Sequence, residues 1–244
     1  MGASGALQIF EEVGSTNDVV RELAEKGGAH GAAVAARRQT AGRGRRGHVW
    51  ESPLGNLYLS ILLRPDVAPS RLPGLSAACG LGALDGLQIA GVSNEVQLKW
   101  PNDLLARERK LGGILVEAFR DSAGDAFAVC GIGINLETSP RALSAICLAE
   151  LGAPVSFSVA AEALRDAIAA RVDAWSFATG ERPLDGIRDD YLAHLAWRGE
   201  KVLALSPVGE PLAAGVLEGV DPWGRAVVDG TAYAAEQASL RPAP

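Results

Sequence analysis

The stretch KLGGILVEAF, residues 110–119, is followed by the turn-forming segment Asp121–Asp125 and by a second apolar stretch, AFAVCGIGIN, residues 126–135. A third apolar run, VQLKW, occupies residues 96–100 just before them. Short apolar runs bounded by turn-forming residues are typical of buried strands. Connections this short favour an antiparallel meander, because parallel βαβ units need longer crossovers. The sequence therefore predicts a sheet built on antiparallel strands.

Further strands and helices are predicted on both sides of this meander. Apolar runs predict strands at 7–10, 32–36 and 56–63. Helical spacing predicts a helix that Ser15–Asp18 introduces and that Gly27 and Gly28 end. It also predicts helices at 73–89, at 159–177 with Ser158 as the cap, and at 184–196. Strands and helices together indicate an α+β protein.

The spacing of apolar residues changes near the C-terminal end of the sequence. From Lys201 onward the apolar runs become short and are separated by segments rich in Pro, Gly and Asp, as at 207–211 and 221–224. Closely spaced short strands of this kind are typical of a small β-barrel. We therefore expect two domains, 1–196 and 197–244, with a boundary near Trp197. The barrel strands are expected at 201–205, 212–218, 225–229 and 231–240.

Composition and charge restrict the classes of function. The 244 residues carry a net charge of −6, so the whole molecule is repelled by nucleic acid and by anionic membranes. The N-terminus lacks a cationic segment followed by an apolar stretch, and the apolar region 72–84 is too short to span a bilayer. Cys79, Cys130 and Cys147 lack C-x-x-C spacing, so we interpret them as buried apolar residues in a reducing compartment. We expect a cytoplasmic protein.

A glycine-rich basic segment stands out against this acidic background. Residues 37–47 hold five arginines and no acidic residue, with Gly42, Gly44 and Gly47 between them. Glycines let a ligand approach the backbone, and guanidinium groups bind carboxylate or phosphate oxygens. A nucleic-acid patch is one alternative, which the net charge opposes. The pattern also fits G-x-G-x-x-G, but here it leads into a strand instead of opening a helix, which argues against a dinucleotide site.

Other polar residues and glycines occur at the ends of predicted strands. Lys99 precedes the bend Pro101–Asp103, where its ammonium group can neutralise a carboxylate and a phosphate, although a surface position is the simpler interpretation. Gly112 and Gly113 weaken a strand unless something lies against the backbone, or they mark a bulge. Gly131–Asn135 again places glycines in a predicted strand, and it ends in the amide of Asn135, which binds a nucleotide or holds a loop. Ser15, Thr16 and Asn17 fit a helix cap or a polar ligand site.

Taken in order, these motifs resemble the biotin protein ligase family. They are Ser15-Thr16-Asn17, Gln39 with Gly42–Gly47, Lys99–Asp103, Lys110–Val116 and Gly131–Asn135, and they span most of the chain. The resemblance implies a mixed, largely antiparallel sheet flanked by helices, as in class II aminoacyl-tRNA synthetases, followed by a small SH3-like β-barrel. Residues 1–196 would be the catalytic domain. It also implies a monofunctional ligase without the DNA-binding domain of the bifunctional members.

The chemistry that the resemblance implies has two steps. The biotin carboxylate attacks the α-phosphate of ATP, bound with Mg²⁺, and gives biotinyl-5'-AMP. A lysine of a biotin carboxyl carrier protein then takes the biotinyl group. No tightly bound prosthetic group, protein-bound metal, nucleic acid or membrane is expected, and the chain is expected as a monomer or homodimer. Preorganised cations lower the barrier for joining two anions, so no enzyme nucleophile is needed.

The resemblance also assigns roles to residues. Lys99, Arg43 and Arg45 are the expected catalytic residues. Asn102 and Asn135, with Arg45 and Lys99, are expected at the nucleotide. The expected biotin-binding residues are Ser15, Thr16, Asn17, Gln39, Arg43, Gly44, Arg45, Lys99, Gly112 and Gly113.

The sequence departs from the family pattern at two places. His48 stands where a basic residue is common in the family, and the stretch 137–149 contains no aromatic residue to pack on adenine. A ligase for lipoate or a related acid is the alternative within the same chemistry. The length of the apolar part of the pocket distinguishes the two.

Overall fold

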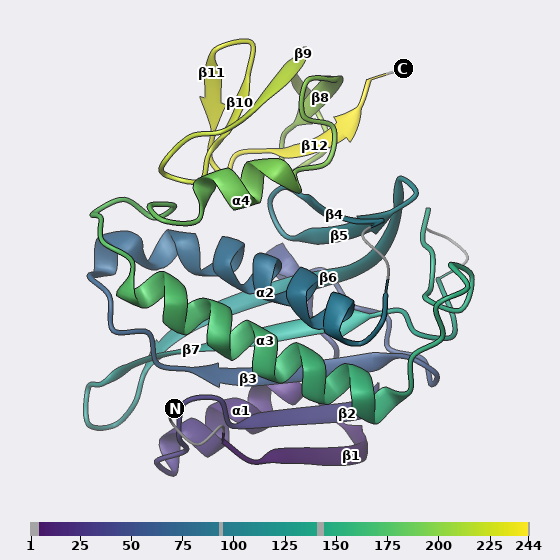
Figure 1. The fold of residues 1–244 in the computed structure, drawn as a ribbon, viewed down its shortest axis with the longest axis vertical. Helices are drawn as coiled ribbons and strands as arrows, with labels where there is room; N and C mark the ends of the chain where they lie inside the picture. Colours follow the sequence, from purple (N-terminus) through teal and green to yellow (C-terminus); the bar gives the residue numbers. More distant parts are fainter. Residues whose placement is uncertain (1–4, 93–94, 141–143, 244) are drawn as a thin grey trace.

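The computed structural model describes residues 5–92, 95–140 and 144–243. Within them a seven-stranded sheet has the order β1-β2-β3-β7-β6-β5-β4 (Figure 1). The pair β1–β2 is parallel, and all the other neighbouring strands are antiparallel. The strands are β1 Leu7–Val13, β2 Ala33–Gln39, β3 Leu57–Leu63, β4 Val96–Lys99, β5 Asp103–Ala106, β6 Arg109–Arg120 and β7 Ala126–Ile134. The sheet is therefore mixed and mainly antiparallel, as predicted.

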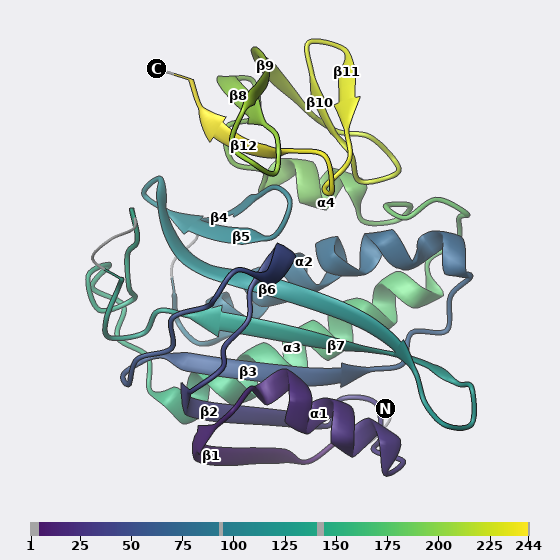
Figure 2. The ribbon, with the colours of Figure 1, turned by 180° about the vertical axis from the view of Figure 1, so that it is seen from behind.

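Helices cover both faces of this sheet. α2 (Leu75–Ile89) and α3 (Phe157–Phe177) lie on one face, whereas α1 (Thr16–Glu25) lies on the other (Figures 1 and 2). Two short 3-10 helices, η1 (Arg45–Gly47) and η2 (Pro69–Gly74), lie in the connections. Val20 and Ala24 of α1 pack on Val34, Leu62 and Val129. α1 covers only part of its face (Figure 2).

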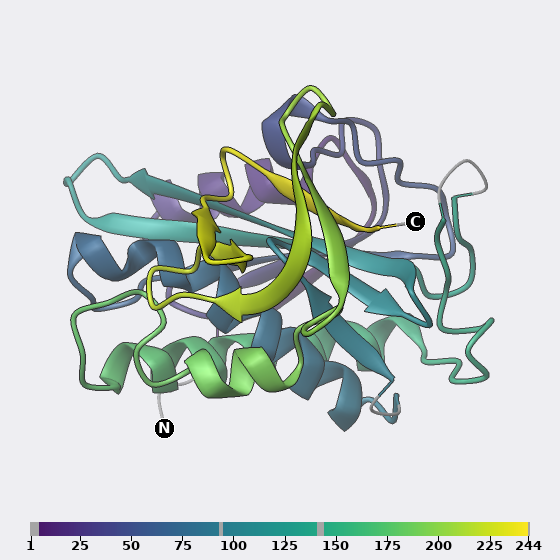
Figure 3. The same cartoon turned by 90° about the horizontal axis from the view of Figure 1, so that it is seen from above.

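A second, smaller sheet stands at one end of the molecule, next to α4 (Arg188–Ala193) and the β4–β5 hairpin (Figure 1). Figure 3 shows it from above, in front of the large sheet. Its order is β11-β10-β9-β8-β12 and all its pairs are antiparallel. The strands are β8 Lys201–Leu205, β9 Pro211–Val220, β10 Ala226–Val228, β11 Thr231–Tyr233 and β12 Ser239–Pro242. One continuous apolar core joins this sheet to the large one.

The structure corrects the prediction between Lys99 and Lys110. The bend predicted at Pro101–Asp103 is a turn that leads into an additional strand, β5, which pairs with both β4 and β6. β5 is only four residues long, and its turn to β6 passes through Arg107 and Glu108, both at positive φ. Charged residues seldom mark a turn of this kind, so the sequence pattern concealed it.

Three further boundaries differ from the prediction. Ser156, not Ser158, caps α3, because its hydroxyl accepts a hydrogen bond from the Val159 amide. Of the helix predicted at 184–196, only α4 forms, since Gly186 adopts a positive φ of 81° that ends any helix there. The strand predicted at 231–240 is split into β11 and β12 by the segment 234–238.

Two other sequence expectations bear on the environment of the chain. The cysteines are buried and free, in agreement with their interpretation as apolar residues. Among the described residues, no helix combines the length and apolar character that crossing a bilayer requires.

Candidate active site

A cavity of about 730 Å³ lies against β6 and β7 of the large sheet. The segment Gly42–Trp50 covers it, and the loop between β8 and β9 borders it. This volume is typical of a site for a small molecule or a nucleotide. Eleven of the twelve predicted site residues line it, namely Ser15, Thr16, Asn17, Gln39, Arg43, Gly44, Arg45, Lys99, Asn102, Gly113 and Asn135.

The floor of the cavity is bare backbone from β6 and β7. A Cβ at Gly133 would lie 2.6 Å from Trp50 Nε1, and one at Gly131 would lie 2.2 Å from Asn17 Oδ1. A Cβ added at Gly113 would lie 3.1 Å from Cζ3 of the same indole ring. A side chain at 131 or 133 would therefore collide with Asn17 or Trp50, whereas one at 113 would only crowd the indole ring.

Gly112 is the one predicted residue that does not line the cavity. A Cβ there would meet the Gly133 carbonyl oxygen at 2.5 Å and the Ile134 side chain at 2.7 Å. Neighbouring residues of a strand point to opposite sides, so Gly113 faces the cavity and Gly112 the sheet interior. The glycine at 112 thus serves strand packing.

A polar network forms one end of the cavity. Gln39 Oε1 accepts hydrogen bonds from the Thr16 amide at 2.9 Å and from the Thr16 hydroxyl at 3.0 Å. Gln39 Nε2 donates to Ser52 Oγ at 3.2 Å, and Asn17 Nδ2 donates to Glu117 Oε2 at 2.7 Å. Ser15 is the N-cap residue of α1, but its side chain makes no capping hydrogen bond. The residues expected as a cap therefore line the cavity, and Thr16 and Asn17 bond to side chains outside α1.

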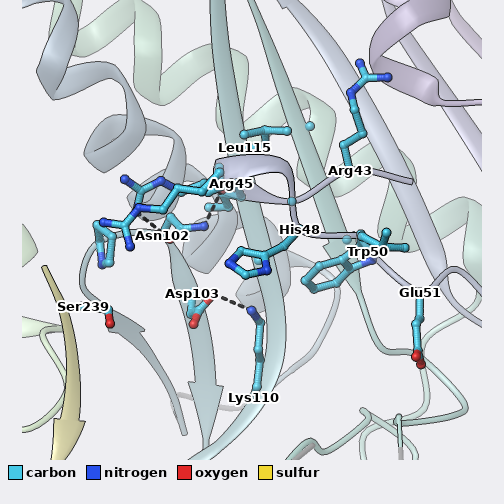
Figure 4. A pocket seen from close by; sticks show the side chains of 18 of the residues that line it. Arg43, Arg45, His48, Trp50, Glu51, Asn102, Asp103, Lys110, Leu115 and Ser239 are labelled. Carbon is cyan, nitrogen blue, oxygen red and sulfur yellow. Dashed lines mark hydrogen bonds and ion pairs between the residues drawn. The ribbon is translucent and has the colours of Figure 1, made fainter. Parts of the chain in front are cut away.

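Arg43 and Arg45 leave the covering segment in different directions (Figure 4). Arg43 points towards α1, where it forms two hydrogen bonds with Asp18, at 2.7 and 2.8 Å, and approaches Glu117 Oε2 at 3.8 Å. The Arg43 hydrogen bond, the largest influence, holds the pKa of Asp18 below its usual value, and Asp18 likewise raises the pKa of Arg43. Arg43 is therefore fixed at the edge of the cavity.

Arg45 points to the opposite side and joins the two sheets. Its guanidinium group donates to Asn102 Oδ1 at 3.3 Å and to the Ala235 carbonyl oxygen at 3.0 Å. Arg46, at a positive φ of 56°, donates to the same carbonyl at 2.7 Å. Burial, followed by the charge of Arg46, lowers the pKa of Arg45. A guanidinium keeps its charge under such a shift, so Arg45 brings a partly desolvated cation to the site.

Two lysines share one carboxylate at the centre of the cavity. Lys99 Nζ lies 3.0 Å from Asp103 Oδ2. Lys110 Nζ lies 2.6 Å from Asp103 Oδ1, and Figure 4 shows this pair. Lys110 also lies over the Trp50 ring, 5.0 Å from its centre. Burial alone would raise the pKa of Asp103, but Lys110 and Lys99 offset this and hold it below its usual range. With two ammonium groups and one carboxylate, the cluster retains a positive charge.

The two asparagines expected at the nucleotide both hold backbone. Asn102 Nδ2 donates to the Ile114 carbonyl at 2.9 Å. Asn135 Nδ2 donates to the carbonyl groups of Ile146 and Lys110, at 3.1 and 3.3 Å. Of the two roles that the sequence left open for Asn135, the structure shows the one of holding a loop.

Besides Asp103, four residues in this site or next to it were not predicted from the sequence. Trp50, Ser60, Lys110 and Glu117 had no assigned role, yet each contacts a predicted site residue or lies on the glycine floor. Asn17 and Glu117 are 100 positions apart, so no local pattern connects them. Of the four, only Lys110 could have been found from the sequence, because it directly precedes the Gly112–Gly113 pair on the same strand.

The described residues contain no group of three or more His, Cys, Asp or Glu side chains suited to hold a metal ion. What the cavity offers instead is fixed cations, amide groups and exposed backbone. This arrangement is typical of a site that binds anionic small molecules.

Comparison with known proteins gives the family. The profile of the Biotin/lipoate A/B protein ligase family matches residues 9–135. The Biotin--[acetyl-CoA-carboxylase] ligase of Paracoccus denitrificans is 35% identical and covers 89% of this chain and 92% of its own length. The Mycobacterium tuberculosis ligase of the same name is 34% identical, with coverages of 91% and 83%. The chain therefore belongs to the Biotin/lipoate A/B protein ligase family.

Solved structures agree with this assignment. The biotin protein ligase from Aquifex aeolicus in complex with biotin and ATP superimposes with a TM-score of 0.78 and is 27% identical. The match covers 97% of this chain and 99% of that one. The mixed sheet flanked by helices is thus the fold of biotin protein ligases, as the motifs indicated.

Proposed function

We propose that this protein activates biotin with ATP to form biotinyl-5'-AMP and transfers the biotinyl group to a lysine of a biotin carboxyl carrier protein. The observation that carries the proposal is the convergence, in one glycine-floored cavity, of a polar head site with fixed cations. The relatives named as biotin--[acetyl-CoA-carboxylase] ligases, which align over most of the chain, support it. The enzyme is therefore a biotin--[biotin carboxyl-carrier protein] ligase.

In the first step, the polar network binds the head of biotin. Ser15, Thr16, Asn17 and Gln39 line one end of the cavity and contact the head, while the backbone at Gly113 lies beside it. The carboxylate of biotin then reaches towards Lys99, which lines the same cavity. Arg43, Gly44 and Arg45 cover the bound molecule, since they belong to the segment above the cavity.

The cations assist formation of the mixed anhydride. A carboxylate oxygen of biotin forms a bond to the α-phosphorus of ATP, and the bond to the pyrophosphate oxygen breaks. Lys99 and Arg45 neutralise the charges that repel each other in this step, and Asn102 and Asn135 lie on the nucleotide side. Fixed cations in a partly desolvated site lower such a barrier without reorganisation.

Mg²⁺ enters this scheme with ATP as part of the substrate. Asp103 is already paired with two lysines, so phosphate oxygens and water are the natural ligands of the ion. Magnesium usually keeps several water ligands and binds to substrate phosphates with few protein groups.

In the second step, the uncharged amine of the carrier lysine attacks the carbonyl carbon of the anhydride. The bond to the phosphate oxygen of AMP breaks, AMP leaves, and the amine loses a proton. No enzyme side chain forms a covalent bond in either step.

The division into two domains is part of the same proposal. The five-stranded sheet supports a small SH3-like domain at 197–244, and the seven-stranded sheet supports a catalytic domain at 1–196. Because Arg45 and Arg46 contact Ala235, the small domain helps to hold the segment that covers the cavity.

Exchange of pyrophosphate into ATP tests the proposed activation directly. We expect exchange to rise when biotin is added to the purified protein, and lipoate to serve as the negative control. Exchange that responds to lipoate and not to biotin would show a lipoate ligase instead. A rise in melting temperature with biotin alone gives an independent measure of binding.

A further inference from the structure

Ser60 of β3 lies behind the polar head site and does not line the cavity. It is completely buried, with a solvent exposure of 0%. Its hydroxyl oxygen lies 2.7 Å from Thr16 Oγ1 and 2.6 Å from Asn17 Oδ1. Both partners belong to the start of α1, and both are nearly buried themselves. One hydroxyl on the central sheet therefore holds two of the side chains that face the ligand.

The direction of each hydrogen bond follows from what each partner can donate. Gln39 Oε1 can only accept, so the Thr16 hydroxyl hydrogen is committed to it. The Glu117 carboxylate also accepts, so it fixes the Asn17 amide with Nδ2 towards Glu117 and Oδ1 towards Ser60. Thr16 Oγ1 and Asn17 Oδ1 thus both face Ser60 as acceptors.

Ser60 has a single hydroxyl hydrogen for these two acceptors. It can satisfy only one of them at a time, which leaves the other ready for a donor from the cavity. A buried acceptor without a donor is unfavourable, so a ligand that supplies an N–H group gains affinity there. The head of biotin is a cyclic urea with two N–H groups, whereas the dithiolane ring of lipoate has none.

We propose that Ser60 is a positioning residue that, by orienting Thr16 and Asn17 as acceptors, selects ligands whose head carries N–H groups. This inference rests on the proposed function and extends it to the choice between biotin and lipoate. A site built around buried acceptors rejects a ligand without donors more strongly than a site that relies on shape alone.

The test measures the KM for biotin, the KM for ATP and kcat in biotin-dependent pyrophosphate exchange. Ser60→Ala should raise the KM for biotin about tenfold or more, with the KM for ATP changed by less than about threefold. Ser60→Cys keeps a weak donor of similar size, so its KM for biotin should lie between those of the wild type and Ser60→Ala. A general loss of packing would move both KM values together.

Ser156→Ala is the matched control, since it also removes one hydroxyl that makes a hydrogen bond. It lies at the cap of α3 and not in the cavity lining. We expect it to lower the melting temperature and to leave both KM values unchanged.

A double variant shows whether Ser60 acts through Thr16. If it does, adding Ser60→Ala to Thr16→Val should raise the KM for biotin by less than the product of the two single effects. Independent, multiplicative effects would overturn the proposal, as would an unchanged KM for biotin in Ser60→Ala. If Ser60→Ala does not fold, Ser60→Cys decides by the same criteria. Wild-type protein without biotin-dependent exchange would instead reject the proposed function, before any variant is examined.

Discussion

At the scale of single residues, the Lys99–Asp103–Lys110 cluster shows how a buried carboxylate can organise two cations. Asp103 holds Lys99 and Lys110 apart and in place, so that neither ammonium group needs to find its position when substrate arrives. The pairing also leaves the cluster one positive charge in excess. That excess is available for an incoming carboxylate or phosphate.

Lys99→Met should reduce adenylate formation by roughly 10²- to 10³-fold, because it removes a fixed charge from the reacting groups. Biotin-dependent pyrophosphate exchange measures the effect. Lys201→Met, at the exposed start of β8, is the control and should retain wild-type activity. Near-normal exchange in the Lys99 variant would show that the assigned role is wrong.

Asp103→Asn should make the free energy of unfolding depend less on pH under acidic conditions. The folded-state pKa of Asp103 is lowered, so its stabilising contribution is complete above the unfolded pKa of about 3.9 and is lost as the pH falls through the folded value. Urea unfolding at pH 7 and near pH 3 gives the comparison. The wild type should lose more free energy of unfolding than the variant, and equal losses would contradict the assignment.

The residue scale also shows where sequence reasoning stops. Family membership was predicted from motifs and is confirmed, because each motif is a run of neighbouring residues. The contacts of Ser60 and Glu117 were not predicted, because their partners lie far away in the sequence. The bidentate pair of Arg43 with Asp18 was missed for the same reason. The individual ligand contacts stay predictions.

At the scale of elements, β6 and β7 combine strand pairing with a ligand surface. Three glycines make the exposed side of this pair flat, while Gly112 allows the two strands to pack on the other side. The long apolar runs of these strands were predicted because their pattern is strong. The four-residue β5 was not, since its length and its turn carry little signal.

Gly112→Ala and Gly113→Ala should separate packing from binding. At position 112 the new methyl group meets a backbone oxygen at 2.5 Å, which cannot move freely. We expect a loss of about 1–3 kcal/mol in the free energy of unfolding. At position 113 the methyl group meets the Trp50 ring at 3.1 Å, so the KM for biotin should rise with a smaller loss of stability. Urea unfolding and exchange kinetics compare the two, and the reverse order would refute the distinction.

Arg45 holds the segment Gly42–Trp50 over the cavity, and this role can be tested. Arg45→Gly removes the contacts with Asn102 and Ala235 and should loosen the cover over the cavity. The reactive anhydride should then escape and label bystander lysines. Mass spectrometry of a mixture of carrier and an unrelated protein measures this. Labelling confined to the carrier would contradict the expected release.

At the scale of the whole molecule, contacts to main-chain carbonyl groups of the C-terminal part join the two sheets. Arg45 and Arg46 donate to Ala235, Trp100 Nε1 donates to Gly224, and Arg188 donates to Val220. Arg45, Arg46 and Trp100 also line the cavity. The position of the small sheet is thus linked to the geometry of the site.

Trp100→Phe should weaken this link, because it removes the indole N–H that donates to the Gly224 carbonyl at 2.9 Å. The unpaired carbonyl and the lost volume should lower the free energy of unfolding by about 1–3 kcal/mol. Thermal and urea unfolding measure the loss. Trp223→Phe, a half-exposed indole in the same part of the chain, is the control and should change stability little.

The identity of the acceptors at this junction has a consequence for sequence change. A carbonyl oxygen belongs to every amino acid, so a substitution at Ala235 leaves the acceptor in position as long as the local backbone keeps its course. Arg45 and Arg46 donate through their side chains, so a substitution at either position removes its hydrogen bond. Divergent relatives can therefore vary the tip of the small sheet freely, whereas insertions or deletions there would shift the oxygen out of reach and release the cover.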